Sequence, residues 1–424
     1  MLVLKNREQC TGCGACYSIC PKNCISMKED NEGFLYPDIN SDGCVHCSMC
    51  KSVCPVHSGR VEDLIVLPET YLTWANNDTL REEATSGGLF SAVAWEILSC
   101  GGIVFGAAYG NDNIVHHIKI ESCNQLERIN RSKYVQSNTG DTFKSVLSEL
   151  ADDKLVLYSG TGCQIYGLLS YLKKKHANTQ NLYTMDVICH GVPSPKLMRE
   201  YLKWHTNDAN SEVTCISMRG KEHPKPFFSL PITTVKYQNG NQYKKAAGDD
   251  FYGRFFWGEI SSRPSCYTCV YKTIGRISDL TIGDCWFSRA LTGRKDVPFD
   301  VTLCLVQSEK GKQLLDELKT ITALKVAERN AIKCNGGMIY SSATPHIKRE
   351  EFFSRLGNEP LNILAEDYFP IKPRQENGVV NVMKEIIKAI PGVYSYYYFK
   401  QKKMEFESRC KRVIPKVAYK KRII

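Results

Sequence analysis

A cysteine pattern that occurs twice near the start of the 424-residue chain constrains its fold more than any other feature. Each copy spells C-x2-C-x2-C-x3-C-P, and the second begins 34 residues after the first. The eight cysteines are Cys10, Cys13, Cys16 and Cys20 in the first copy, and Cys44, Cys47, Cys50 and Cys54 in the second. Such a repeat predicts two metal centres of one kind, each held by a tight loop.

The spacing indicates iron–sulfur clusters. Three closely spaced thiolates bind one cluster, and the cysteine next to proline reaches the other. By this rule one [4Fe–4S] cluster is held by Cys10, Cys13, Cys16 and Cys54, and the second by Cys44, Cys47, Cys50 and Cys20. The alternative is zinc, but zinc gives no reason for the third close cysteine or for the prolines. We therefore expect a bacterial ferredoxin-like domain over residues 1–63, in which Cys24 is a spare buried thiol.

Length and composition describe the rest of the chain. It is 43% hydrophobic and 24% charged, which is typical of packed domains, and its length favours more than one of them. No apolar run is long enough to span a bilayer, and the cysteine pattern starts too early to leave room for a signal peptide. We expect a cytoplasmic protein in which the thiols bind metal and form no disulfides.

After residue 63 the pattern changes to alternating strands and helices. It predicts an overall α/β (α+β) fold, in which the larger domain has a mixed, partly parallel sheet. Strands are expected at 103–109, 155–158, 182–188 and 279–283, and helices at 89–98, from the loop 159–164 to the lysines at 173–175, and at 195–205. The strand–helix–strand order over 155–188 implies a parallel crossover, so both strand ends face one edge of the sheet. We divide this region into 64–150, 151–355 and a basic tail, 356–424.

Four further cysteines are candidates for a third [4Fe–4S] cluster. Cys163 and Cys189 follow the two strand ends that share an edge, where open α/β sheets bind ligands, and Cys266 and Cys269 form a C-x2-C pair in a loop. Alternatively, the first two are unconnected buried thiols and the pair is a weak metal or redox site. Cys285 is the substitute ligand if one of the four is wrong. The others are expected to be structural: Cys100, Cys123, Cys215, Cys304, Cys334 and Cys410.

A Ser86-Gly87-Gly88 turn precedes the helix expected at 89–98. Ser86 is a candidate cap for that helix, and the turn directs free backbone N–H groups outward. It is therefore either a seat for a phosphate or only a helix cap.

In their order, these motifs resemble the beta subunit family of the coenzyme F-420 hydrogenases and dehydrogenases, in the form with an N-terminal two-cluster ferredoxin domain. The match covers about residues 1–355 and rests on Ser86-Gly-Gly, Ser132-Lys-Tyr-Val-Gln-Ser137, Gly160-Thr-Gly-Cys-Gln164, Asp186-Val-Ile-Cys-His-Gly-Val-Pro193, Cys266-x2-Cys269 and Ile282-Gly-Asp-Cys-Trp286. The resemblance implies that the larger domain binds FAD beside a [4Fe–4S] cluster and passes electrons between clusters and an organic acceptor.

The same resemblance implies site residues. Ser86, Gly87 and Gly88 are expected to cradle the FAD phosphates, and the residues expected to line the flavin pocket are Lys133, Gln136, Ser137 and Thr161. Cys163, Cys189, Cys266 and Cys269 match the cysteines of the adjacent cluster. The family usually has Pro where this chain has Gly162, so we expect that loop to be more flexible. Because family members act on different acceptors, including deazaflavins and chlorophyll-type pigments, the acceptor does not follow from the fold.

His190 and Lys133 are the candidate catalytic residues. His190 is either a proton donor at the flavin or a hydrogen-bond partner of the neighbouring cluster ligand. Lys133 either stabilises negative charge on reduced flavin or forms a surface salt bridge.

The end of the chain is strongly basic. Residues 391–424 begin with a run of aromatic side chains and contain ten Lys and Arg against two acids. This helical tail is expected to contact an anionic membrane surface peripherally, to dock an acidic redox partner, or simply to pack on the core. Nucleic acid is not expected as a partner, because no groove-reading motif accompanies the charge.

The leading hypothesis is an oxidoreductase that uses FAD and [4Fe–4S] clusters, with ferredoxin or another redox protein as donor and a small molecule as acceptor. The alternative is an electron-transfer subunit that relays electrons within a larger complex and has no substrate of its own. In a third class the clusters are structural and no flavin is bound.

Overall fold

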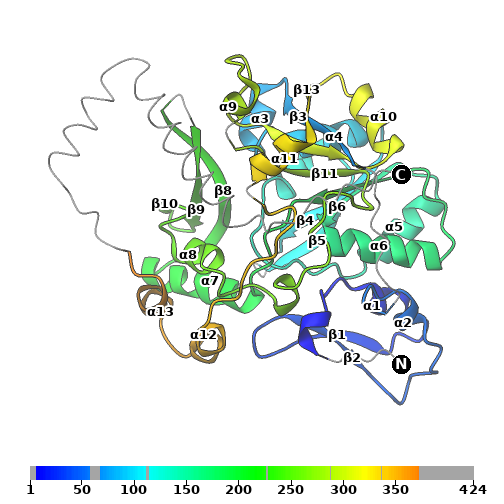
Figure 1. The fold of residues 1–424 in the computed structure, drawn as a ribbon. Helices are drawn as coiled ribbons and strands as arrows, with labels where there is room; N and C mark the ends of the chain where they lie inside the picture. Colours follow the sequence, from blue (N-terminus) through cyan, green and yellow to red (C-terminus); the bar gives the residue numbers. More distant parts are fainter. Residues whose placement is uncertain are drawn as a thin grey trace, which may run out of the picture.

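The computed structural model describes residues 6–57, 67–110, 114–225, 228–286, 288–335 and 337–371. A small cysteine-rich domain (residues 6–57) lies beside a larger domain built on an eight-stranded sheet (Figure 1). A side unit with its own three-stranded sheet flanks the larger domain. Of the predicted basic tail, 356–424, residues 372–424 lie outside the described residues. Within the described ranges, no helix is long and apolar enough to cross a membrane.

The cysteine-rich domain consists of short elements joined by tight turns. They are η1 (Arg7–Gln9), α1 (Ala15–Ile19), β1 (Ile25–Glu29), β2 (Leu35–Ile39) and α2 (Met49–Ser52). Strands β1 and β2 pair antiparallel. Gly12 and Gly14 have φ angles of 70° and 80°, in the left-handed region that glycine adopts without strain. The cysteine loops therefore turn sharply on either side of Cys13.

The sheet of the larger domain is mixed. Its strand order is β13-β3-β12-β11-β7-β6-β4-β5, and the four strands β11, β7, β6 and β4 are parallel. The bounds are β3 (Glu69–Ala75), β4 (Ile103–Tyr109), β5 (Val115–Ile120), β6 (Val156–Thr161), β7 (Leu182–Val187), β11 (Leu280–Asp284), β12 (Thr302–Val306) and β13 (Ile321–Val326). The predicted partly parallel sheet and the crossover from β6 to β7 are confirmed, and the strand predicted at 103–109 is β4.

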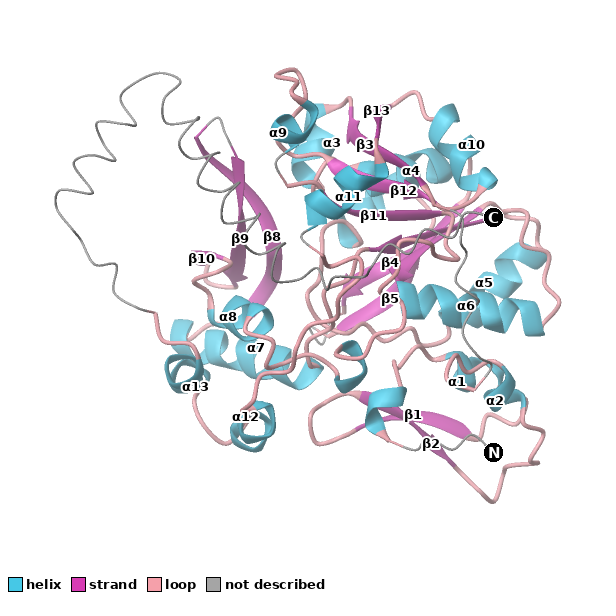
Figure 2. Ribbon diagram, in the orientation of Figure 1, coloured by secondary structure: helices cyan, strands magenta, loops and turns pink. Residues whose placement is uncertain are grey.

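Helices cover both faces of this sheet (Figure 2). They are α3 (Asp78–Glu83), α4 (Leu89–Ser99), η2 (Cys123–Arg128), α5 (Thr142–Ala151), α6 (Gly162–Lys174), α9 (Ser288–Thr292), α10 (Glu309–Glu317) and α11 (Glu328–Asn335). Because side chains alternate along a strand, β4 serves two cores. Val104 packs with α4 on one face, whereas Ile103 and Phe105 pack with α5 and α6 on the other.

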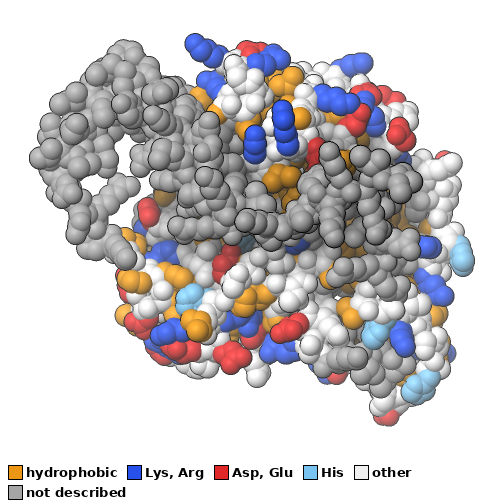
Figure 3. Space-filling view, viewed as in Figure 1, with side chains coloured by type: hydrophobic (Ala, Val, Ile, Leu, Met, Phe, Trp, Pro, Cys, Tyr) orange, Lys and Arg blue, Asp and Glu red, His pale blue; other side chains and the backbone are white. Residues whose placement is uncertain are grey.

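Of the side unit, the sequence predicts only the helix at 195–205, which is α7, and not the three-stranded sheet. The unit contains α7 (Pro195–Ala209), β8 (Val213–Lys225), β9 (Phe228–Tyr237), β10 (Gln242–Ala246), α8 (Phe251–Trp257), η3 (Pro264–Cys266), α12 (Arg349–Arg355) and α13 (Leu361–Tyr368). Tyr201, Phe255 and Phe352 are buried in its core. Helix α13 buries Leu364 there, so the folded chain continues past residue 355. On the face visible in Figure 3, charges of both signs mix with scattered apolar side chains.

The start of α4 differs from the expected cap. Gly88 is the N-cap residue, with φ at 83°, and the Ser86 hydroxyl instead donates to the Asp284 carboxylate. The free N–H groups at the start of α4 are therefore not covered by the Ser86 side chain.

A buried arginine joins the cysteine-rich domain to the rest of the molecule. Arg263 is fully buried, and its guanidinium donates to the backbone oxygens of Cys10 (2.7 Å) and Leu35 (2.8 Å). A third hydrogen bond, 2.8 Å long, reaches the side-chain oxygen of Gln136 in the larger domain. The guanidinium also lies 4.2 Å from the ring centroid of Tyr36. Because a buried cation needs such partners, Arg263 fixes how the two domains meet.

We predict that Arg263→Ala lowers the free energy of unfolding by about 3 kcal/mol, because three charge-assisted hydrogen bonds are lost in a buried position. Denaturant unfolding of anaerobically purified protein measures this. The control is Arg199→Ala, which removes a half-exposed ion pair with Glu29 across the same boundary and should cost about 1 kcal/mol or less. Equal losses in the two variants would contradict the role of Arg263.

Candidate redox centres and their cavities

The eight cysteines of the repeat surround two small cavities in the cysteine-rich domain. One, of about 370 Å³, is lined by Cys10, Cys13, Cys16 and Cys54. The other, of about 360 Å³, is lined by Cys20, Cys44, Cys47 and Cys50. The structure thus groups the cysteines in the crossed arrangement expected from the spacing, with each proline-linked cysteine in the cavity of the other copy.

The environment of the first set suits a cationic cluster. Burial raises the pKa of Cys13 to about 11 and that of Cys16 well above its usual value, and the nearby Cys10 and Cys54 raise both further. Thiolates held this close repel one another unless positive iron offsets their charge. Across the described ranges, no three His, Cys, Asp or Glu side chains converge on a point suited to one metal ion. A cubane differs, because its four thiolates bind four separate irons.

A fifth thiol adjoins the second cavity. Cys24 lines it, and its sulfur lies 3.3 Å from that of Cys20. The pKa of the Cys24 thiol is raised to about 11, first by its contact with Cys20. The sequence suggests only a spare buried thiol at this position. The reason for the difference is that β1 begins at Ile25, which holds Cys24 at the rim of the cavity.

The four cysteines of the third set also lie together. Cys163 is in the first turn of α6, Cys189 follows β7, and Cys266 and Cys269 lie in and after η3. Burial raises the pKa of Cys163 well above its usual value and that of Cys266 to about 12, and Cys189 and Cys269 add to both shifts. Cys285 does not belong to this group, because its sulfur contacts Cys334 instead.

A capping box holds Cys163 in place. The Gln164 side chain accepts a hydrogen bond from the Thr161 backbone N–H (3.0 Å), which closes the first turn of α6. Gly162 is the first residue of this helix and does not lie in a flexible loop, contrary to the expectation from the sequence. A Cβ at Gly162 would lie 3.1 Å from the Asp186 carboxylate, so a side chain has little room.

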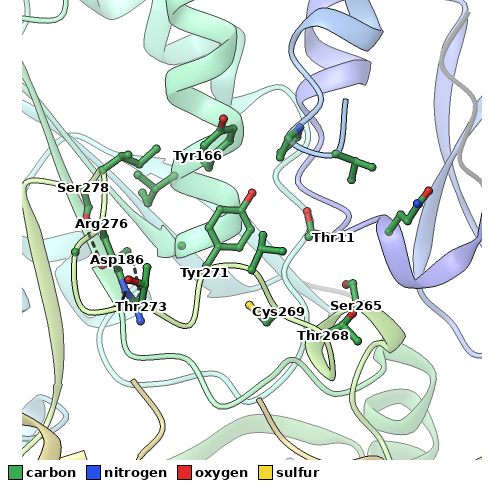
Figure 4. Close-up of a pocket in the computed structure, with 18 of the residues that line it drawn as sticks. Thr11, Tyr166, Asp186, Ser265, Thr268, Cys269, Tyr271, Thr273, Arg276 and Ser278 are labelled. Carbon is green, nitrogen blue, oxygen red and sulfur yellow. Dashed lines mark hydrogen bonds and ion pairs between the residues drawn. The ribbon is translucent and has the colours of Figure 1, made fainter. Parts of the chain in front are cut away.

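The first and third sets approach each other at α6. Gly167 lies one helical turn after Cys163, and a Cβ there would come within 3.0 Å of the Cys13 sulfur. Next to α6 is a cavity of about 1340 Å³ including its open mouth, in which Tyr271 stands between Thr11, Tyr166 and Cys269 (Figure 4). The pKa of Tyr271 is raised by burial and further by the thiols Cys163 and Cys13. The two sets are thus separated by little more than α6 and Tyr271.

A second large cavity, of about 1610 Å³ including its open mouth, lies at the carboxyl edge of the parallel strands. It collects most of the residues expected to hold a flavin, and Cys189 of the third set lines it too. Those residues are Ser86, Gly88, Lys133, Ser137, Thr161 and His190. The arrangement follows from the parallel order of β6, β7 and β11, whose ends meet at this edge.

Gln136 and Gly87 do not line this cavity. The Gln136 amide donates to the Thr11 backbone oxygen (3.1 Å) and its oxygen accepts from Arg263, so the side chain serves the domain boundary. The Gly87 N–H donates to the Thr302 hydroxyl (2.9 Å). A Cβ at Gly87 would lie 2.3 Å from the Thr73 backbone oxygen, so Gly87 allows close packing on the sheet.

The two candidate catalytic side chains have distinct environments. Burial, with Arg131 nearby, lowers the pKa of Lys133 to about 7. Its ammonium donates to the Asn130 backbone oxygen (2.6 Å), which is not the surface salt bridge considered as an alternative. His190 Nε2 lies 2.6 Å from the Glu259 carboxylate, and the two side chains are about one-fifth exposed.

Sequence reasoning missed two further groups in this cavity. His117 on β5 donates from Nε2 to the Ser159 backbone oxygen (2.9 Å), and its Nδ1 lies 2.7 Å from the Ser137 hydroxyl. Burial lowers the pKa of His117 to about 4, so it is neutral at pH 7. Arg219, from β8, pairs with Asp284 at the end of β11. No spacing signal marks these residues, because their partners are far away in the sequence.

Comparison with known proteins gives two family matches. Residues 153–331 match the family described as the C terminus of the coenzyme F420 hydrogenase/dehydrogenase beta subunit, and residues 9–58 match a 4Fe-4S dicluster domain. No curated protein matches the chain in sequence. Among solved structures, a chain of the F420-reducing [NiFe] hydrogenase complex from Methanosarcina barkeri aligns with a TM-score of 0.41 and 12% identity, covering 63% of this chain and 85% of that one.

We predict that Cys163→Ser lowers the iron content of anaerobically purified protein from about twelve to about eight per chain, because one of three clusters is lost. Iron and acid-labile sulfide analysis measures this. Cys304→Ser is the control, since Cys304 is a buried thiol on β12 outside the three cysteine sets and should leave the count unchanged. A count of about eight in the unmodified protein would refute the third cluster.

We predict that Lys133→Met stabilises the protein near pH 6.5 and that this advantage shrinks as the pH rises. The folded pKa of Lys133 is about 7, whereas an unfolded lysine titrates near 10.4, so between these values the unfolded chain binds more protons. Unfolding free energies of the two proteins should converge by up to about 1 kcal/mol per pH unit between pH 7 and 9.5. Lys119→Met, at an exposed position of β5, should show no such convergence; a constant difference for Lys133→Met would contradict the lowered pKa.

Proposed function

Because the chain belongs to the coenzyme F420 hydrogenase/dehydrogenase beta subunit family, we propose that it is an iron–sulfur flavoprotein oxidoreductase. It passes electrons between a ferredoxin-type redox protein and an organic acceptor. The proposal includes FAD in the cavity at the sheet edge and a third [4Fe–4S] cluster on Cys163, Cys189, Cys266 and Cys269. One observation carries it: Cys189 belongs to the third cysteine set and also lines that cavity.

A flavin in this cavity would supply the exchange between single electrons and the two-electron reduction of an organic molecule. The cavity suits its anionic diphosphate, because Arg131, Lys133 and Arg219 line the wall near Ser86 and Gly88. The residues that would hold the cofactor are therefore Ser86, Gly88, Lys133, Ser137 and Thr161, while Gln136 and Gly87 support the fold around them.

His190 is the proposed proton-holding group. It lines the cavity directly after Cys189, and Glu259 faces its Nε2 atom at 2.6 Å. At this distance the carboxylate can form an ion pair with the ring when the ring carries a proton. Lys133, whose pKa lies near neutrality, is suited to balance negative charge that develops in the cavity.

The route of electrons into the larger domain follows the contact between α1 and α6. Cys13 belongs to the first cysteine set, and its sulfur approaches Gly167, one helical turn from Cys163 of the third set. The absence of a side chain at Gly167 keeps these two sets close. The iron–sulfur domain is therefore the entrance for electrons, and the third set is its connection to the cavity.

The second candidate is a relay subunit that passes electrons within a larger complex and has no acceptor of its own. The description of the matched family as a beta subunit favours it. The two functions differ in turnover. The purified chain alone should reduce an organic acceptor from dithionite or reduced ferredoxin if it is an oxidoreductase, whereas a relay needs its partner protein.

We predict that anaerobically purified protein, reconstituted with FAD, binds about one FAD per chain and that Lys133→Met weakens this binding about tenfold, because one charge-assisted contact is lost. Fluorescence titration with FAD measures both affinities, and extraction identifies the bound flavin. The control variant is again Lys119→Met, which should bind as the unmodified protein does. Failure of the folded, iron-replete protein to bind any flavin would overturn the proposed function.

A further inference from the structure

Two buried cysteines touch each other behind the wall of the cavity at the sheet edge. Cys285 directly follows β11 and Cys334 lies in the last turn of α11, and they are 4% and 0% exposed. Their sulfur atoms are 2.9 Å apart. That is closer than the roughly 3.5–4 Å at which non-bonded heavy atoms settle. The two sulfurs therefore need to approach each other only slightly further to reach the length of an S–S bond.

The fold holds this pair in place beside the cavity. The Asn335 side chain donates to the Asp284 backbone oxygen (2.5 Å), which ties the residue after Cys334 to the residue before Cys285. Asp284, Trp286 and Asn335 all line the cavity. The two thiols therefore lie one residue behind its surface, at the end of the parallel strand β11.

The pair differs from the other buried thiol of this region. Cys304 lies on β12 opposite Ile282, is equally buried, and behaves as a small apolar side chain within the sheet. Cys285 and Cys334 instead face each other across two separate elements. Their mutual contact and burial raise the pKa of Cys285, so the reduced pair stays protonated. A disulfide carries no charge, so oxidation leaves no thiolate in this apolar core.

We propose that Cys285 and Cys334 are a reversible dithiol/disulfide couple, a redox centre additional to the clusters, which exchanges electron pairs with a two-electron organic carrier in the adjoining cavity. On oxidation two S–H bonds break and one S–S bond forms. Two electrons reduce the carrier, of the flavin class, and two protons leave to the water of the cavity; reduction reverses each change. The identity of the carrier rests on the proposed function, whereas formation of the bond does not.

The sequence allows a direct test, because trypsin separates the relevant cysteines. Peptides 277–289, 334–348 and 296–310 each contain one cysteine, namely Cys285, Cys334 and Cys304. FAD-reconstituted protein is poised anaerobically with ferricyanide or dithionite, quenched in acid, alkylated under denaturing conditions and digested. Mass spectrometry then measures how much of each peptide is alkylated and how much is cross-linked.

We expect ferricyanide to convert most of peptides 277–289 and 334–348 into one cross-linked species, two hydrogen masses lighter than their sum. Dithionite should return both to the alkylated form. Peptide 296–310 should be alkylated in every sample, and Cys285→Ser should leave Cys334 alkylated. Full alkylation of both peptides after ferricyanide and also after diamide, which oxidises dithiols directly, would overturn the couple. Cross-linking of Cys304 to the same extent would do so as well.

Protein depleted of flavin separates this inference from the proposed function. If diamide still forms the cross-link there while ferricyanide forms it only after FAD is restored, both proposals are supported. If diamide forms the cross-link but FAD never binds, the couple stands and the proposed cavity ligand is wrong.

Discussion

The buried guanidinium of Arg263 holds the cysteine-rich domain against the larger domain. It donates to Cys10 and Leu35 of the cysteine-rich domain and to Gln136 of the larger domain, and it stands three residues before Cys266. A fully buried cation cannot hydrogen-bond to water, so these protein partners must be in place whenever the domains are docked. One side chain thus couples the position of the first cysteine set to the loop that carries the third.

The second constraint is the parallel order of the central strands. Because β6, β7 and β11 run in the same direction, the residues that follow them meet at one edge of the sheet. That edge receives Cys163, Cys189 and Asp284 in turn. The parallel strand order therefore places the third cysteine set, the cavity at the sheet edge and the Cys285–Cys334 pair close to one another. The capping box of α6 and the missing side chain at Gly167 then determine how closely the first cysteine set approaches the third.

The features that the sequence predicts well are local or follow from topology. The spacing within each cysteine run is a property of one loop, and the shared edge of Cys163 and Cys189 follows from a strand–helix–strand order. Arg263 and Gln136 gave no such signal, because their partners lie more than a hundred residues away. The family resemblance places Gln136 in the flavin pocket, whereas its side chain contacts Thr11 and Arg263 at the domain boundary. His117 was missed for a similar reason, since it is one histidine in an alternating strand and only its distant contacts mark it.

The proposed electron route requires three groups of iron, placed in a fixed order by the docked domains. An anomalous diffraction map at the iron absorption edge, from crystals grown anaerobically, tests this most directly. It should contain three compact peaks per chain, and the peak among Cys10, Cys13, Cys16 and Cys54 should lie nearer to the peak beside Cys163 than the remaining one does. A map with no iron beside Cys163, or with the order of the two N-terminal peaks reversed, would contradict the account.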